Sequence, residues 1–160
     1  MNLTSEQIID YLHRSYTAVD GLWFMKVEDE YGFDRALEID AEVWKIFPKI
    51  QARKLKELTG LENGIDDLYE CFTLKLSLDQ LQYTAAKDAD GNGFTVSITQ
   101  CPWLDLLRKS QREHLAGKVG SRICTTEYST WAAEFGPRIH FQLQSQICEN
   151  ADCCRLRFTA

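Results

Sequence analysis

The sequence predicts an α+β fold, with N-terminal helices packed on an antiparallel sheet of about four strands and further helices inserted between its two hairpins. Two observations support this prediction. Apolar residues recur at steps of three and four along the first half of the chain, whereas from Leu81 onward apolar and polar residues alternate at a period of two. We expect one domain, residues 1–160, that is mainly helical over residues 1–79 and carries the sheet and a cysteine cluster over residues 80–160.

The first helix is expected to start after a cap at Thr4 or Ser5, to reach about Glu30 and to stop at Gly32. A stripe of apolar residues at helical spacing comprises Ile8, Leu12, Tyr16, Val19, Trp23, Val27 and Tyr31. This spacing places the stripe along one side of the helix.

A second helical stretch is predicted over residues 34–58, with Gly60 as its C-terminal signal. Pro48 should kink this stretch or split it in two, because proline lacks the backbone N–H that a helix interior uses. A third helix is predicted over residues 66–78, where apolar residues again follow helical spacing.

Two alternating segments, residues 81–85 and 94–98, predict the strands of a hairpin joined by the turn-forming run DADGNG at residues 88–93. The same run resembles the first half of a calcium loop. Such a loop needs a bidentate Glu at its twelfth position, and Thr99 occupies that position here. A plain hairpin turn is therefore the expected structure.

The remaining elements are two helices and a second hairpin. We expect a helix over residues 102–115, a loop at the glycines of 117–120 and a short helix over residues 125–135. Alternation then predicts strands at residues 139–147 and 154–158 that pair with each other.

Charge and composition exclude some classes of function. The net charge of -6 and the pI near 5.1 argue against binding to nucleic acid, which requires clustered Lys and Arg. The basic residues of 45–56 alternate with apolar ones and indicate a solvated helix face. No apolar run is long enough for a membrane span and no signal peptide is evident, so we expect a cytoplasmic protein without a disulfide framework.

Four of the six cysteines are predicted to meet at one end of the sheet. Cys101 lies where a strand turns into a helix, Cys124 before another helix, Cys148 at the end of a strand and Cys154 at the start of its partner. Glu127 follows Cys124 by one helical turn. Because a helix N-terminus stabilises a thiolate, this group suits zinc or iron bound by four thiolates, or by three and a carboxylate.

Other interpretations of these residues remain open. The cysteines can be buried core residues, or one of them can be a metal-free catalytic thiol activated by Glu127 or His140. Asp40 falls on the apolar stripe of the second helix, so it is either a boundary carboxylate or, together with Glu28, an acid or base in a pocket. His13 is expected to be a structural or surface residue.

The motifs of the chain resemble a family of uncharacterised cytosolic prokaryotic proteins distantly similar to the L-2-amino-thiazoline-4-carboxylic acid hydrolases. The residues that carry the resemblance are Cys101-Pro102-Trp103, Cys124-x2-Glu127, Trp131-Ala132-x2-Phe135, Cys148, Cys154-Arg155-Leu156-Arg157-Phe158, Trp23-x3-Val27-Glu28, Gly32, Ala36-x3-Asp40-x3-Trp44 and Ala52-Arg53. The hydrolases tend to have a glycine-rich turn and an acidic residue beside the last cysteine. This chain has Cys153 before that cysteine and Arg155 after it.

The leading functional prediction is a site for a metal or a small ligand formed by Cys101, Cys124, Cys148 and Cys154. If the protein is an enzyme, the resemblance implies hydrolysis of a carbon–nitrogen bond in a small heterocycle or amide, with Glu127 or Asp40 as the acid or base. The alternative is a non-enzymatic, metal-stabilised domain for ligand sensing or interaction.

Overall fold

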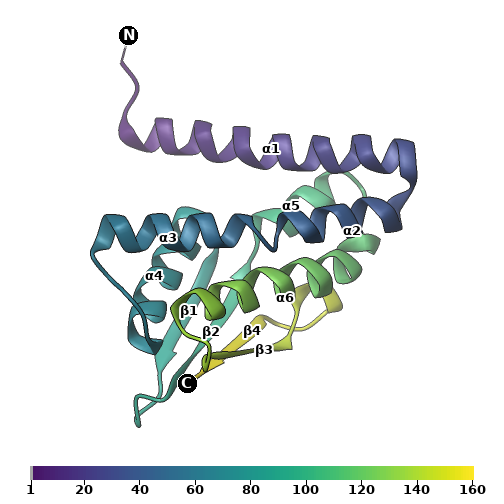
Figure 1. The fold of residues 1–160 in the computed structure, drawn as a ribbon. Coiled ribbons are helices and arrows are strands. Elements are labelled where there is room, and N and C mark those ends of the chain that lie inside the picture. The colour runs from purple at the N-terminus through teal and green to yellow at the C-terminus, as the bar shows by residue number, and fades with distance from the viewer. Residues whose placement is uncertain (1) are drawn as a thin grey trace. The chain divides into compact units, whose positions relative to one another are not determined.

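The computed structural model describes residues 2–160, and its α+β architecture confirms the predicted fold class (Figure 1). In the described range the elements are, in order, α1 (Ser5–Tyr31), α2 (Phe33–Val43), α3 (Phe47–Thr59), α4 (Ile65–Leu78), β1 (Gln82–Lys87), β2 (Gly93–Gln100), α5 (Pro102–Lys109), the 3-10 helix η1 (Glu113–Leu115), α6 (Ala116–Phe135), β3 (His140–Ser145), the 3-10 helix η2 (Ile147–Glu149) and β4 (Cys154–Thr159). The chain forms two compact units, residues 1–40 and 41–160. The single domain stays a prediction.

The first unit contains α1, which begins with the predicted cap. The Thr4 side chain accepts a hydrogen bond from the Gln7 backbone N–H at 3.2 Å, and the Gln7 side chain accepts one from the Thr4 N–H at 2.9 Å. The helix ends at Gly32, whose φ of 82° favours glycine. Five residues of the predicted apolar stripe are exposed, namely Ile8, Leu12, Val19, Trp23 and Tyr31.

The helical stretch that contains Pro48 is split in two, as predicted. Helix α2 ends at Val43 and α3 starts at Phe47, so Pro48 lies in the first turn of α3, where its missing N–H costs no helical hydrogen bond. Gly60 ends α3 in the left-handed conformation with φ 71°, and its N–H donates to the Lys56 carbonyl.

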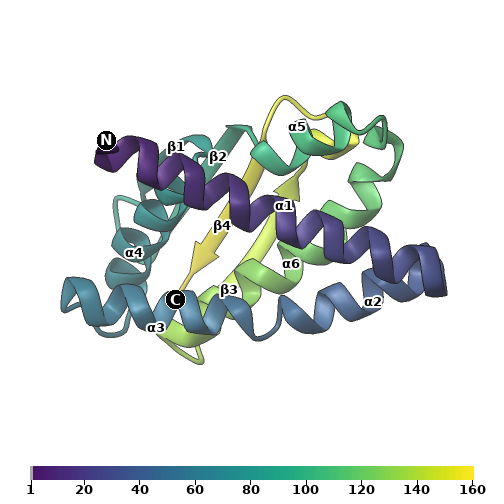
Figure 2. The same cartoon turned by 90° about the horizontal axis from the view of Figure 1, so that it is seen from above.

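The second unit is built on a four-stranded antiparallel sheet with the order β1-β2-β4-β3. On β2 and β4 the buried side chains alternate with partly exposed or exposed ones, so one face of the sheet is covered and the other is open. Contacts of α4 with β1 and of α6 with β3 place these helices on the covered face (Figure 2).

The turn between β1 and β2 is a hairpin turn, as predicted. Asp88 forms a bidentate ion pair with Arg157 of β4, and Asp90 accepts hydrogen bonds from the backbone and side chain of Asn92. Both carboxylates thus have partners within the turn or the adjoining sheet. Gly93 is required next to it, because a Cβ there would lie 2.5 Å from the Phe158 carbonyl oxygen.

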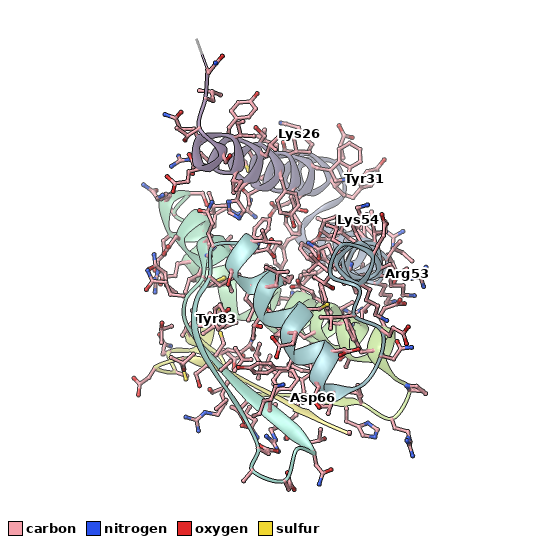
Figure 3. The ribbon with its side chains drawn as sticks, turned by 90° about the vertical axis from the view of Figure 1, so that its left-hand side faces the viewer. Lys26, Tyr31, Arg53, Lys54, Asp66 and Tyr83 are labelled. Atoms are coloured by element: carbon pink, nitrogen blue, oxygen red, sulfur yellow. The ribbon has the colours of Figure 1, made fainter. Side chains whose placement is uncertain are left out.

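An aromatic core joins the helices to the covered face of the sheet. Phe72 of α4 contacts the rings of Trp131 at 5.8 Å and Phe158 at 4.9 Å between centroids. At the edge of this core the Tyr83 hydroxyl of β1 donates to the Thr73 carbonyl of α4 at 2.8 Å, and Figure 3 shows Tyr83 beside that helix. The core fixes α4, α6 and the sheet around one interior.

Two predicted boundaries in the second half are wrong. Helix α5 ends at Lys109 rather than near Leu115, with Gln111 at a positive φ of 59° before η1. Helix α6 starts at Ala116, so the expected loop at Gly117 and Gly120 is helical. No helix among residues 2–160 is long and apolar enough to cross a membrane.

Candidate functional site

The four predicted cysteines lie on four different elements of the second unit. Cys101 caps the N-terminus of α5 and Cys154 begins β4, as predicted, while Cys148 lies in η2 just after β3. The position predicted for Cys124 is wrong: it lies inside α6 and not before a helix.

Close packing explains why α6 continues through its two glycines. A Cβ at Gly120 would lie 3.1 Å from Gln146 Nε2 and 3.3 Å from Cys148 Sγ. A Cβ at Gly117 would lie 3.4 Å from the Cys148 carbonyl oxygen. The glycines therefore let η2 approach α6 closely, and this tertiary contact outweighs their low helix propensity.

The fold brings the four cysteines into one electrostatic neighbourhood. Burial raises the pKa of Cys124 well above its ordinary value, and Cys101, Glu127, Cys154 and Cys148 raise it further, because their ionised forms would repel a Cys124 thiolate. Burial likewise raises the pKa of Cys148 to about 12 and that of Cys154 to about 11, with the Cys101 thiol adding to both.

These thiols are consequently protonated at neutral pH, which corrects the expectation of thiolates stabilised by helix N-termini. Cys101 is at such a terminus and accepts backbone hydrogen bonds that lower its pKa, yet burial is the larger effect and the pKa is raised. All six cysteines of the chain are free thiols.

As placed, the thiols do not form a coordination sphere. Among residues 2–160 no three His, Cys, Asp or Glu side chains are arranged so that they could hold one metal ion together. The donor types still suit zinc, which takes sulfur ligands at about 2.3 Å in a tetrahedron. The metal site stays a prediction that requires the side chains to turn toward one another.

A buried ion pair lies beside the cysteines and was not expected from the sequence. The ammonium of Lys75 on α4 is 2.5 Å from Glu127 Oε1 on α6 and 3.1 Å from Asp79 Oδ2. The side chains of Lys75 and Glu127 are only 5% and 7% exposed, so the pair is almost completely removed from water. The predicted candidate Glu127 therefore has a cationic partner.

The two carboxylates determine the charge state of Lys75. Burial by itself disfavours the ammonium form, but Glu127 and then Asp79 raise the pKa of Lys75 above its ordinary value by charge attraction and hydrogen bonding. Lys75 is therefore a permanent cation with no nucleophilic lone pair at neutral pH. Its Nζ lies 5.3 Å from the centroid of the Tyr128 ring, which further favours the positive charge.

A sequence signal for Lys75 did exist. Lys75 falls on the apolar stripe of α4, seven residues after Leu68 and three after Phe72, and both of these are buried. A lysine on an apolar stripe has to reach water or find a buried anion. Its partner Glu127 is 52 residues away and could not be assigned without the fold.

Two hydrogen-bond donors in the same interior lack acceptors. Trp131 Nε1, one turn along α6 from Glu127, has no partner among the described residues, and neither does Gln146 Nε2, which lies near Cys148. Trp131 is fully buried and Gln146 is 5% exposed. A buried donor without an acceptor is costly, so both positions favour an additional hydrogen-bonding molecule.

A polar cavity of about 340 Å³ opens next to Cys101. Its wall includes Leu104, Asp105 and Arg108 from α5 and Ile147 from η2. The size is at the lower end of the range for small-molecule pockets. This cavity gives the cysteine end of the interior access to solvent.

The other predicted residues lie on α1, α2 and β3. Asp40 is half-buried near the end of α2 in the first unit, and its role as an acid or base stays a prediction, as does that of Glu28 on α1. His140 is exposed at the start of β3. His13 lies on α1, half-buried.

The fold of the chain is similar to a known sensory domain. The crystal structure of the phenol-responsive sensory domain of the transcription activator PoxR with phenol matches it with a TM-score of 0.55 and 13% identity, over 89% of this chain and 72% of that chain. At this identity the likeness concerns the fold alone.

The chain belongs to DUF6125, a family of unknown function whose model matches residues 2–158. No curated protein matches the sequence. The predicted membership in an uncharacterised family is thereby confirmed, whereas its distant similarity to the thiazoline carboxylate hydrolases stays a prediction.

Proposed function

We propose that the second unit is a non-enzymatic sensing domain that binds a small molecule beside the Lys75–Glu127 ion pair. The observation that carries this proposal is the burial of that pair within an aromatic core. Replacing a buried ion pair by apolar residues of similar volume is often neutral or stabilising, so stability alone does not explain the pair. Buried ionic groups of this kind gather where a protein binds or reacts with something.

The surroundings of the pair indicate the kind of ligand. Trp131 Nε1, one turn along α6 from Glu127, is a donor without an acceptor, so a ligand with an oxygen acceptor would satisfy it. The rings of Tyr128 and Phe72 make the interior suited to an aromatic body. The phenol response of the structurally similar PoxR domain supports the same class, a small aromatic molecule with a hydroxyl or carboxyl group.

A hydrolase is supported less well by the same geometry. A cysteine nucleophile needs a thiolate, whereas the pKa values of Cys101, Cys124 and Cys154 are all raised. The Glu127 carboxylate is already engaged in an ion pair with the ammonium of Lys75. Binding without chemistry needs neither a thiolate nor a free base.

The proposal is tested by the melting temperature of the protein titrated with phenol and with benzoate. We expect a saturable rise with at least one of them, because a ligand that binds only the folded state stabilises it by mass action. The variant Lys75→Met/Glu127→Leu should fold, given its similar volume, and lose the rise. The matched variant Arg53→Met/Glu134→Leu changes the pair between α3 and α6 whose arginine is exposed, and it should keep the rise. Equal responses in both variants, or no response in the unaltered protein, would refute binding at this site.

We propose in addition that the four cysteines bind a structural zinc or iron ion, which would link the four elements on which they lie. The specific observation is that the Cys101 thiol raises the pKa values of Cys124, Cys148 and Cys154, which places all three within electrostatic range of it. Four thiolates close to each other are stabilised by a divalent cation. Glu127, already paired with Lys75, would stay outside the coordination sphere.

Elemental analysis of protein purified without oxygen tests this structural metal site. About one zinc or iron per chain is expected, and the variant Cys124→Ser/Cys154→Ser should lose it. A metal content that is the same in the variant, or near zero in the unaltered protein, would assign the cysteines to the core. The test does not involve phenol, so it can fail while the ligand proposal stands.

A further inference from the structure

One face of α1 exposes an apolar surface that nothing within its own unit explains. Its six large side chains are Ile8, Tyr11, Leu12, Val19, Leu22 and Trp23. At 100° per residue they fall within an arc of about 120°. Val19 is 67% and Trp23 66% exposed, which are high values for such residues.

This face is uncharged over four turns. The charged residues between Ile8 and Trp23 are Asp10, Arg14 and Asp20, and by helical geometry all three lie outside the arc. The six side chains expose on the order of 600 Å² of surface, whereas soluble monomers rarely expose apolar patches above a few hundred Å². Such a patch indicates an interaction surface.

The face is complementary to itself when two copies run antiparallel. With a two-fold axis at Ser15, Ile8 of one helix lies opposite Leu22 of the other, and Tyr11 lies opposite Val19. The large side chains then flank a small one at the centre, which lets two helices approach closely.

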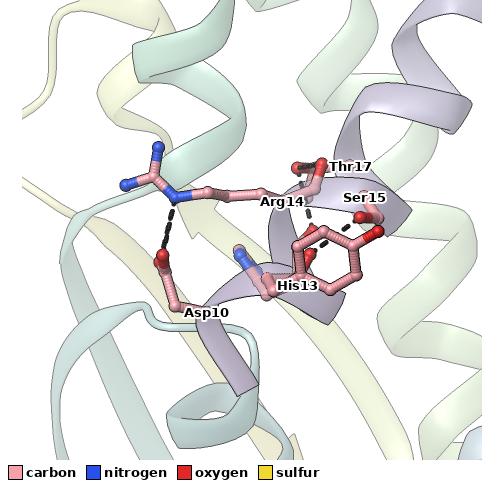
Figure 4. A network of polar contacts seen from close by, with 6 residues as sticks. Asp10, His13, Arg14, Ser15 and Thr17 are labelled. Atoms are coloured by element: carbon pink, nitrogen blue, oxygen red, sulfur yellow. Dashed lines mark hydrogen bonds and ion pairs between the residues drawn. The ribbon is translucent and has the colours of Figure 1, made fainter. Parts of the chain in front are cut away.

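Ser15 is suited to the centre of such a contact. Its hydroxyl donates to the Tyr11 carbonyl at 2.8 Å on the same helix, as Figure 4 shows beside the ion pair of Arg14 with Asp10. Because that hydrogen bond is made within the helix, burying Ser15 leaves no polar atom without a partner.

Charge selects the antiparallel direction. Lys26, Asp29 and Glu30 follow the apolar region only at its C-terminal end, on the same side of α1. Parallel helices would set these groups against their own copies. Antiparallel helices place them at opposite ends of the contact, where they reach water.

We propose that α1 is a dimerisation helix that pairs with α1 of a second copy of the chain, antiparallel and centred on Ser15. The apolar area of one face approaches the roughly 800 Å² per partner of a standard interface. This role rests on the proposed sensing function: the domain then has a monomeric and a dimeric state, and ligand binding can shift the equilibrium between them.

The mass in solution, measured by light scattering after gel filtration, tests the dimer. The unaltered protein should show twice 18.4 kDa, and Leu12→Glu/Val19→Glu should show 18.4 kDa, since it buries four carboxylates at the contact. The control Arg14→Glu changes an exposed residue outside the face and should remain dimeric. Circular dichroism of each variant verifies that α1 is still helical.

Cysteine cross-linking tests the direction of the helices. Ser15→Cys should form a disulfide-linked dimer under mild oxidation, whereas Lys26→Cys should not, because antiparallel pairing separates the two copies of residue 26 by about 30 Å. The unaltered chain, with its six thiols, sets the background. Cross-linking through residue 26, or a monomer mass at every concentration, overturns the proposal.

Discussion

Two carboxylates on α6 occupy nearly the same side of the helix, two turns apart, and each receives a cation from a neighbouring helix. Glu127 is bound by Lys75 of α4 at 2.5 Å, and Glu134 by Arg53 of α3 at 2.8 Å. The two pairs differ mainly in how far the cation is exposed to water. The Lys75 side chain is 5% exposed and that of Arg53 is 69% exposed, whereas the Glu127 and Glu134 side chains are 7% and 16% exposed.

The comparison shows that counting ion pairs does not reveal which of them are candidates for a function. The exposed Arg53 forms a pair that joins α3 to α6, loses little solvation in doing so and adds little to stability. The buried Lys75 forms a pair that costs desolvation on both sides, and its neighbours are thiols and donors without acceptors. Burial, and not the distance between the charges, marks the second pair as the candidate functional group.

The largest effect is expected from Glu127→Ala. This change leaves the buried Lys75 ammonium with Asp79 alone, and removing one partner of a buried pair typically costs ~3–5 kcal/mol. The free energy of unfolding from urea titration measures it. Glu134→Ala is the matched control on the same helix, and an equal loss in both variants would show that burial does not distinguish the two pairs.

A smaller loss of stability is expected at alkaline pH, and much of it should come from the buried thiols near Glu127. Burial holds the pKa values of folded Cys148 and Cys154 at about 12 and about 11, against an ordinary value of 9.0. Above pH 9 the unfolded chain therefore loses thiol protons that the folded chain keeps. Stability is fully retained below pH 9 and falls as the pH rises through the folded pKa values.

The measurement is the melting temperature between pH 8 and pH 10 for metal-free protein. We expect a decrease on the order of a few degrees per pH unit, and a shallower decrease in Cys148→Ala. The range stops at pH 10 because Tyr128 and Lys75, whose pKa values are also raised, act in the same direction above it. A melting temperature that rises with pH in this range would contradict the assignment.

The sequence was sufficient where local rules decide the structure. The Thr4 cap, the end at Gly60, the break at Pro48 and the hairpin turn at residues 88–93 each depend on a few adjacent residues. The loop expected at Gly117 and Gly120 failed because these glycines serve a contact with η2, which no local rule reveals.

The candidate site was only partly predictable for the same reason. Strand alternation placed Cys154 correctly at the start of β4, and Cys101 followed from the proline that opens α5. The pKa values were predicted in the wrong direction, since a position near a helix terminus is visible in sequence but the depth of burial is not. Lys75 was visible as a charge on an apolar stripe, whereas its pairing with Glu127 required the packing of α4 on α6.

The smallest effect is expected at the exposed pair. Arg53→Ala should lower the free energy of unfolding far less than Glu127→Ala does, because Arg53 loses little solvation in forming the pair and Glu134 regains water when the pair is broken. The loss should shrink further in 1 M salt, where the screening length falls to about 3 Å. The corresponding loss in Glu127→Ala should hardly change with salt, since ions do not enter the interior. If salt acts equally on both variants, then the Lys75–Glu127 pair is accessible to solvent ions, and the distinction between a structural and a functional ion pair on α6 is lost.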